Sequence, residues 1–348
     1  MTTSPAGRSG VAAAAALRAA IDLARYAPSL HNAQPWSWRV VGEVAELSAD
    51  PARAVPVADP FGREMLLGCG AALHHARTAL AADGWPVRVS HLPEPDRPDL
   101  IARVELADRQ DVELADRQDP DPAATRLAEA ITRRRTDRRP FAPEPLPEAV
   151  LQALRSAVQE EEGTYLALLT DAEDRIELAV LSARAERIQS ADPAYDAELA
   201  AWTGDRPGRD GVPPSQVPHL SEPRHSDVVL RDFEQDRPGQ ASVPAGVDEQ
   251  PAWAILYTVG DGRQDQIRAG EAMSALMLTA TDLGLATGVQ SQPVEVAVVR
   301  AQIDGRLLNG LGHAQLVMRL GWPDPAAPDL PAAPRRPLDE VLHENPQP

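Results

Sequence analysis

Lysine is absent from this sequence of 348 residues, and all 34 basic residues are arginine. Schiff-base chemistry and a lysine general base are therefore excluded. The single cysteine, Cys69, excludes an intrachain disulfide, and its apolar surroundings favour a buried thiol over a nucleophile. Aromatic residues make up only 4%, so the core must be built from Ala, Leu and Val.

Long apolar runs and familiar catalytic signatures are also missing. No run reaches the ~18 residues expected of a membrane-spanning helix, and Leu17, Ile21 and Ala24 fall on one face of an amphipathic helix rather than in a signal peptide. We therefore expect no membrane partner and a cytoplasmic location. HExxH, CxxC and GxSxG are absent, which leaves no metal motif and no obvious catalytic acid, base or nucleophile.

The charge balance excludes another class of partner. Acidic residues outnumber basic ones by 52 to 34, which gives a formal net charge of -18. Nucleic acid needs a basic face to contact its phosphates, so we expect no nucleic-acid partner. The length favours two domains of roughly 150 residues each.

Hydrophobic periodicity predicts that helices and strands are interspersed in both halves of the chain. The first half is expected to contain helices at about 12–26 and 61–83 and strands at about 36–41, 44–49, 85–92 and 101–106. The second half is expected to contain helices at about 123–134, 172–200 and 270–284, a further helix after the turn that begins at Pro143, and strands at about 165–170, 252–259 and 314–321.

Two unusual segments mark the organisation of the chain. The octad VELADRQD occurs at residues 104–111 and again at 112–119. The simplest interpretation is a loop between domains that tolerates a duplicated segment. We therefore place a domain boundary between 1–121 and 122–348. Residues 202–250 contain seven prolines and are too long for an ordinary connection, so this segment is either disordered or a lid.

A weak internal repeat suggests duplication. Residues 69–89 align with residues 269–289, and each stretch is an Ala-rich helix, a small-residue stop and a strand. Ala-rich helices resemble one another easily, so the repeat alone is marginal.

A polar turn with the sequence SLHNAQPW follows the first helix, and it contains Ser29, His31, Asn32 and Gln34. A polar helix stop followed by an edge strand would account for Pro28 and Trp36. It would not account for the spacing of the Ser, Asn and Gln side chains. The amides of Asn and Gln can match the donors and acceptors of a heterocycle.

The sequence RRRTDRRPF at 133–141 concentrates arginine in an acidic protein. Arg134, Arg135 and Arg138, with Thr136 among them, suit a phosphate group because guanidinium groups bind it in a bidentate manner. A solvated charged face is the alternative interpretation. Two further polar groups are candidates for the same site, namely Gln290, Ser291 and Gln292 after a Gly-capped helix, and Arg335 and Arg336 near the C-terminus.

Together, SLHNAQPW and RRRTDRRPF resemble the flavin-holding motifs of the nitroreductase-like FMN proteins. In that family the motifs come in the opposite order, within a domain of roughly half this length. The order here is similar to that of the Acg-type branch. The resemblance implies a three-layer α+β fold with mixed sheets, in which two related halves form an internal pseudo-dimer around one FMN. The second half would supply the arginines and the Gln290–Gln292 loop, and the first half the Ser/Asn/Gln turn.

The function that the resemblance implies is an FMN-dependent oxidoreductase that passes electrons from NAD(P)H to a small nitro- or quinone-type acceptor. The internal pseudo-dimer would allow a monomer, with further dimerisation possible. One alternative is a protein that sequesters FMN beneath a 202–250 lid with little turnover. The other alternative is a surface binding module without a cofactor.

Overall fold

The structure of the protein, a computed structural model, describes residues 5–106, 122–203, 209–219, 228, 231, 240–242 and 250–344. The first half comprises α1 (Pro5–Ala24), β1 (Trp36–Val41), β2 (Val44–Ala49), α2 (Arg63–Ala82), β3 (Val87–His91) and β4 (Leu100–Leu106). The octad repeat begins at the end of β4, and its residues 107–119 lie outside the described residues.

The second half begins with two helices and a strand. Its elements are α3 (Pro122–Arg133), α4 (Glu148–Gln159), β5 (Thr164–Leu169), α5 (Ala172–Gln189), α6 (Pro193–Trp202), β6 (Pro218–His219), β7 (Ala241–Ser242), β8 (Ala252–Thr258), α7 (Arg263–Asp282), β9 (Ala286–Gln290), α8 (Gln292–Glu295), α9 (Ala297–Arg306), β10 (His313–Gly321), α10 (Leu338–Val341) and β11 (Leu342–Glu344).

The two large sheets share one strand order. The first runs β11-β1-β2-β4-β3, and the second runs β5-β8-β10-β9. In each, four successive strands pair in the order first, second, fourth, third, and a long helix lies between the second and third. All pairs within these two sets of four are antiparallel, and only β11 lies parallel to β1. The first sheet is therefore mixed, as expected, whereas the second is antiparallel.

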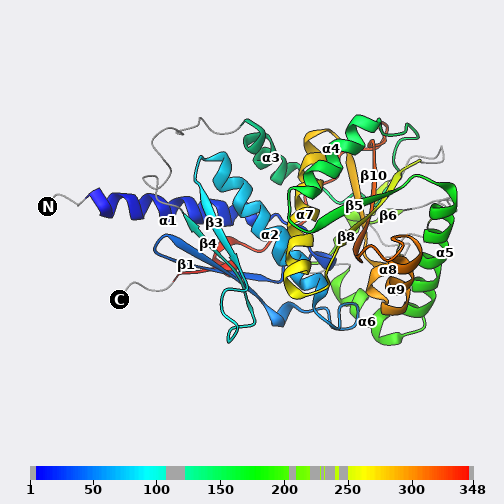
Figure 1. Ribbon diagram of the computed structural model, residues 1–348, viewed down its shortest axis with the longest axis horizontal. Coiled ribbons are helices and arrows are strands. Elements are labelled where there is room, and N and C mark those ends of the chain that lie inside the picture. Colours follow the sequence, from blue (N-terminus) through cyan, green and yellow to red (C-terminus); the bar gives the residue numbers. More distant parts are fainter. Residues whose placement is uncertain are drawn as a thin grey trace.

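Helices α2 and α7 form the centre of the molecule. Helix α2 packs on the first sheet, α7 packs on the second, and the two helices pack against each other (Figure 1). This gives three layers of sheet, helices and sheet, with α5 and α9 covering the outer face of the second sheet. The predicted α+β class and three-layer arrangement are confirmed. No helix in the described part of the chain is long and apolar enough to cross a membrane.

The contact between α2 and α7 depends on two glycines. A Cβ atom added at Gly70 would lie 2.0 Å from the carbonyl oxygen of Ile267, and one added at Gly270 would lie 2.1 Å from that of Leu67. The internal repeat aligns Gly70 with Gly270, and the same offset of 200 residues relates Leu67 to Ile267. The contact is therefore reciprocal, as in a two-fold interface between related segments.

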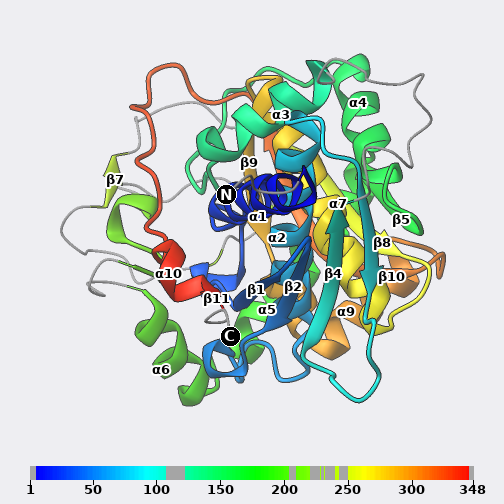
Figure 2. The same ribbon diagram turned by 90° about the vertical axis from the view of Figure 1, so that its left-hand side faces the viewer.

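The C-terminus returns to the first half of the chain. Strand β11 joins the edge of the first sheet beside β1, and α10 lies immediately before it (Figure 2). Three-residue strands and single-turn helices carry little periodicity, which is why neither element was predicted.

Three helix predictions were wrong in extent. The helix expected at about 12–26 is α1, which begins earlier, at Pro5. The helix expected at 172–200 is interrupted before Pro193, where Asp192 accepts the backbone N–H of Ala194 and caps a new helix, α6. The helix expected from 270 begins at Arg263 instead. Its first turns are polar, but the Asp265 carboxylate accepts the backbone N–H of Gly262 at 2.9 Å and stabilises the start.

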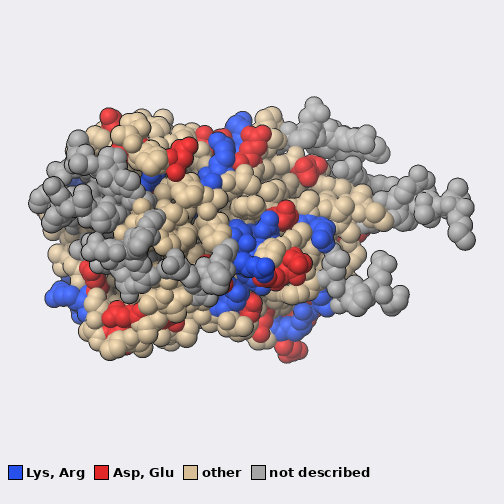
Figure 3. Space-filling view, turned by 180° about the vertical axis from the view of Figure 1, so that it is seen from behind, with Lys and Arg blue, Asp and Glu red and all other residues tan. Residues whose placement is uncertain are grey.

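Exposed charges of both signs are interspersed on the surface. Figure 3 shows basic side chains gathered near the middle of one face, with acidic side chains among them. Buried charges are paired as well. On the first sheet, the Glu46 carboxylate accepts hydrogen bonds from Arg39, Arg97 and Arg103. Burial raises the pKa of Glu46, but these bonds outweigh it and lower the pKa to about 2. Arginines outside the site thus commonly have acidic partners.

Candidate functional site

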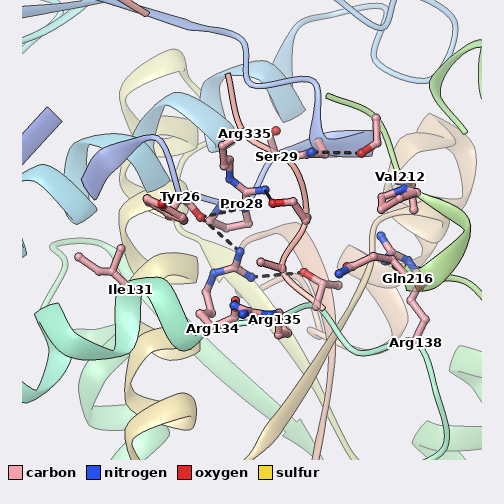
Figure 4. Close-up of a pocket in the computed structure, with 16 residues that line it drawn as sticks. Tyr26, Pro28, Ser29, Ile131, Arg134, Arg135, Arg138, Val212, Gln216 and Arg335 are labelled. Carbon is pink, nitrogen blue, oxygen red and sulfur yellow. Dashed lines mark hydrogen bonds between the residues drawn. The ribbon is translucent and has the colours of Figure 1, made fainter. Parts of the chain in front are cut away.

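A pocket of about 50 Å³ lies where the two halves meet, and both predicted motifs line it (Figure 4). The first half contributes residues at the end of α1 and in the following turn, and the second half contributes the end of α3 and two later segments. The lining residues are Tyr26, Pro28, Ser29, Asn32, Ile131, Arg134, Arg135, Thr136, Arg138, Gly211, Val212, Pro213, Gln216, Ala332, Ala333 and Arg335. Segments far apart in the sequence therefore form one site.

The SLHNAQPW turn has an uncommon backbone. His31, Asn32 and Gln34 have φ values of 48°, 56° and 53°, in the left-handed region that residues other than glycine seldom adopt. The Ser29 hydroxyl accepts the backbone N–H of Gln34 at 2.9 Å and closes the turn. Trp36 is fully buried and anchors the start of β1. Strained backbone that is fixed from both ends is typical of ligand-binding sites.

The amide groups of this turn hold the segments that form the far wall of the pocket. Asn32 donates to the carbonyl oxygens of Gly211 at 3.1 Å and Pro334 at 3.0 Å. The side-chain oxygen of Gln34 accepts the backbone N–H of Arg336 at 2.9 Å. Asn32 lies on the pocket lining, whereas Gln34 is fully buried behind it.

Four arginines line the pocket, and three of them, Arg134, Arg135 and Arg335, enter it from two directions. Arg134 makes only long hydrogen bonds, at 3.4 Å, to Thr136 Oγ1 and to the carbonyl oxygen of Tyr26. Arg335 donates to the same Tyr26 carbonyl at 3.0 Å, and Arg135 binds only backbone carbonyls (Figure 4). The Nε atoms of Arg134 and Arg335 are buried without a hydrogen-bond partner. None of the three has a carboxylate partner among the residues that the structure describes.

The electrostatics of the arginine pocket favour an anion. Burial, together with the charges of Arg335 and Arg135, lowers the pKa of Arg134 to about 9. Burial and the charge of Arg135 lower the pKa of Arg335 to about 10, and burial and Arg231 lower that of Arg138 to about 10. Burial is the largest cause of each shift, and the charges of neighbouring arginines add to it. An anion with several acceptor oxygens would relieve this repulsion.

The other arginines of the RRRTDRRPF motif have separate roles. Arg139 forms an ion pair with Asp137 at 2.8 Å and lies away from the pocket lining. Arg133 is exposed and donates only to the carbonyl oxygen of Glu129. Arg134, Arg135 and Arg138 are therefore the members of the motif that line the pocket.

The remaining candidates lie beside this pocket rather than in its lining. Gln290, Ser291 and Gln292 are buried at the end of β9 and the start of α8. Arg336 is buried behind the turn, where it donates to the carbonyl oxygens of Gln34 and Trp36. Two other predicted residues, Thr136 and Arg335, do line the pocket.

A second polar cluster joins the turn to the loop after β9. Arg231 donates to His31 Nε2 at 3.1 Å and to Ser291 Oγ at 3.4 Å, and it forms a buried ion pair with Glu295. The His31 side chain is 6% exposed. Burial, with the charges of Arg231 and Arg138, lowers the pKa of His31 well below its usual value. Arg231 belongs to the proline-rich segment, most of which lies outside the described residues.

The sequence also matches a known family. The model described as the nitroreductase family covers residues 131–322. This chain belongs to the nitroreductase family. It is 36% identical to Rv3131 of Mycobacterium tuberculosis H37Rv over 94% of this chain and 90% of that protein, and 35% identical to Acg of the same strain over 94% of this chain and 95% of that protein. Both relatives are named provisionally as NAD(P)H nitroreductases.

The family match confirms the resemblance that the two motifs indicated, including the similarity to Acg. Among solved structures, a nitroreductase with bound FMN from Bacteroides fragilis aligns with 58% of this nitroreductase-family chain and 90% of its own, at 16% identity and a TM-score of 0.35.

Sequence reasoning missed two polar residues near the second cluster. Glu64 is buried against Arg63, and burial raises its pKa to about 7. Tyr195 lies 5.9 Å from the Arg231 guanidinium, measured to the ring centroid. An Arg-Glu pair at a helix start and a tyrosine within a helix are ordinary sequence features, so nothing in the sequence distinguished them.

Proposed function

We propose that this chain is an FMN-binding oxidoreductase of the NAD(P)H nitroreductase type, with one flavin held between its two halves. The observation that carries the proposal is the group of three arginines without carboxylate partners in the described part of the chain, the buried Arg134 and the half-buried Arg135 and Arg335, at the meeting point of the two motifs. The nitroreductase family and the FMN named for its member from Bacteroides fragilis accord with it.

The residues of the site suit the two ends of FMN. The arginine pocket has the size and charge for a phosphate group, and Thr136 adds a hydroxyl donor. The turn at 29–34 and the loop at 290–292 come from opposite halves and would bind the ring. When bound, the flavin accepts and releases electrons, while the protein orients it and excludes water.

A pocket of about 50 Å³ is smaller than the roughly 300–1,000 Å³ of ordinary small-molecule sites. The ring therefore needs more space than this arrangement leaves. The segments at 211–216 and 332–335 line the pocket. Asn32 donates to both of them, and Gln216 Nε2 donates to the carbonyl oxygen of Pro331 at 2.6 Å, so the two segments are also joined to each other. We infer that they shift when FMN binds.

We further propose that residues 1–121 and 122–348 form two related halves. The shared strand order and the reciprocal Gly70 and Gly270 contact support an internal pseudo-dimer. The helices α2 and α7 span 63–82 and 263–282, so the repeat continues at the same offset of 200 residues.

The repeat relates the proposed flavin site to a second position in the molecule, and the side chains at that position are different. The repeat aligns His91 with Ser291, and Glu161 stands after α4 where a second turn would belong. There Glu271 is fully buried, 2.8 Å from His91 Nε2 and 2.5 Å from Arg77, and Arg77 lies 3.1 Å from Glu161. A buried ion-pair network thus takes the place of a second set of flavin contacts, which supports one flavin per chain.

Flavin storage beneath a lid is the second candidate function. It is favoured by the burial of Val228 and Arg231, two described residues of the predicted lid at 202–250, and by the wall that residues 211–216 add to the pocket. A covered flavin could not stack against a nicotinamide ring.

Reduction kinetics separate the two candidates. If the protein is an oxidoreductase, NADPH should reduce the bound flavin in stopped-flow absorbance measurements at a rate that saturates with NADPH concentration. Dithionite, a small reductant that needs no binding site, is the control. Prompt reduction by dithionite with no reduction by NADPH or NADH would contradict the oxidoreductase and support storage.

A further inference from the structure

The hydrogen bond between Arg231 and His31 determines the protonation of the histidine ring. A guanidinium group only donates hydrogen bonds, so the His31 Nε2 atom, 3.1 Å from Arg231 Nη1, must accept. A neutral imidazole has one N–H group. The ring proton of His31 is therefore on Nδ1, which makes that atom a hydrogen-bond donor.

Arg231 is itself fixed in place. Its second terminal nitrogen binds the Glu295 carboxylate and the Ser291 hydroxyl, and its guanidinium lies over the Tyr195 ring. The side chains of Arg231 and Glu295 are 6% and 0% exposed. A buried arginine held by a carboxylate does not lose its proton or rotate freely, so its contact with His31 is durable.

The charges around His31 oppose a second proton on the ring. Among the residues that the structure describes, the cations Arg231 and Arg138 act on the ring. The charges of Glu295, Glu64 and Tyr195 act on the Arg231 guanidinium. Burial disfavours the imidazolium form as well. The φ of 48° at His31 fixes the backbone from which the ring projects.

We propose that Arg231 is a positioning residue that locks His31 in its neutral Nδ1–H tautomer, so that His31 serves the flavin ring as a neutral hydrogen-bond donor and not as an acid. This control of the tautomer by Arg231, called the lock below, does not depend on a bound ligand. The identity of the ligand rests on the proposed function.

The first test uses the full chain without flavin. Ring ¹⁵N chemical shifts, assigned by comparison with His31→Asn, should show a neutral Nδ1–H imidazole throughout pH 5 to 8. The double variant Arg231→Gln/Glu295→Gln removes both charges and leaves no unpaired carboxylate, and in it the pKa of His31 should rise by about one unit or more towards the ordinary ~6.5. Arg231→Lys, which keeps a donor with positive charge, should leave His31 neutral.

The second test measures the dissociation constant of riboflavin, which lacks the phosphate. His31→Asn and His31→Asp have nearly the same shape, and both accept left-handed backbone, but only the amide donates. The Asn variant should bind within about threefold of the original protein, and the Asp variant about tenfold or more weakly, equivalent to the ~1.4 kcal/mol of one hydrogen bond.

An Nε2–H tautomer, or titration of His31 between pH 5 and 8 in the unaltered protein, would overturn the lock. Equal riboflavin affinities for the Asn and Asp variants would overturn the donor role while leaving the flavin site intact. Failure of the unaltered protein to bind FMN or riboflavin would instead refute the proposed function, and the NMR result would still decide the lock.

Discussion

Replacing Arg134 and Arg335 together by methionine should weaken FMN binding by roughly two to four powers of ten. Hydrogen bonds to charged groups contribute about 1.5–3 kcal/mol each, and about 1.4 kcal/mol corresponds to a tenfold change in affinity. Both guanidinium groups line the pocket, and both carry a buried Nε atom without a partner. Fluorescence titration of the flavin-free protein measures the change.

Two controls show whether the loss concerns the phosphate. Riboflavin should bind the double variant nearly as well as the unaltered protein, because it has no phosphate to lose. Arg133→Met changes the exposed last residue of α3, directly before Arg134, and should leave both affinities unchanged. Equal weakening of FMN and riboflavin by the double change would mean that these arginines support the fold and do not bind phosphate.

The single change Arg134→Met should stabilise the flavin-free protein at pH 7. Burial lowers the pKa of Arg134 to about 9, so keeping its charge at neutral pH costs folding free energy. The cost declines as the pH rises through 9, where the folded form of Arg134 begins to lose its proton. The advantage of Arg134→Met in denaturant unfolding should therefore shrink between pH 7 and pH 10.

Gly70→Ala should destabilise the protein by about 3 kcal/mol or more, or prevent folding. The added Cβ atom would lie 2.0 Å from the carbonyl oxygen of Ile267, and backbone cannot yield as a flexible side chain does. Helices α2 and α7 would have to separate, which would disturb both sheets and the site between the halves.

Gly305→Ala is the matched control. Gly305 lies within the helix α9, and a Cβ atom added there meets nothing within 4 Å. This change should be neutral or stabilise the protein by up to about 1 kcal/mol, because alanine favours helix. Guanidinium unfolding of the two variants gives the comparison. If Gly70→Ala proved as stable as Gly305→Ala, the close approach of α2 and α7 would be wrong.

The sequence predicted which motifs form the arginine pocket, because each carries its chemistry locally. The arginines follow one helix and the polar turn follows another. The family resemblance was the only basis for predicting that they meet in one site. The repeat could have placed the start of α7 at Arg263, since its partner α2 begins at Arg63, but polar first turns obscured the periodicity.

Other features of the site depend on contacts between distant segments. The Asn32 amide holds Gly211 and Pro334, and no local pattern specifies such partners. The bond from Arg231 to His31 joins residues 200 positions apart. The left-handed backbone at Gln34 likewise contradicts the preference of that residue type, and only surrounding structure maintains it.

The stoichiometry of bound flavin tests the central claim most directly. The protein is saturated with FMN, freed of excess by gel filtration and denatured, and the released flavin is measured by absorbance against the protein concentration. Native mass spectrometry gives the same ratio for the intact complex. One FMN per chain, absent from the Arg134→Met/Arg335→Met variant, is the result that we predict. No bound FMN, or two per chain, would contradict a single flavin held between two related halves.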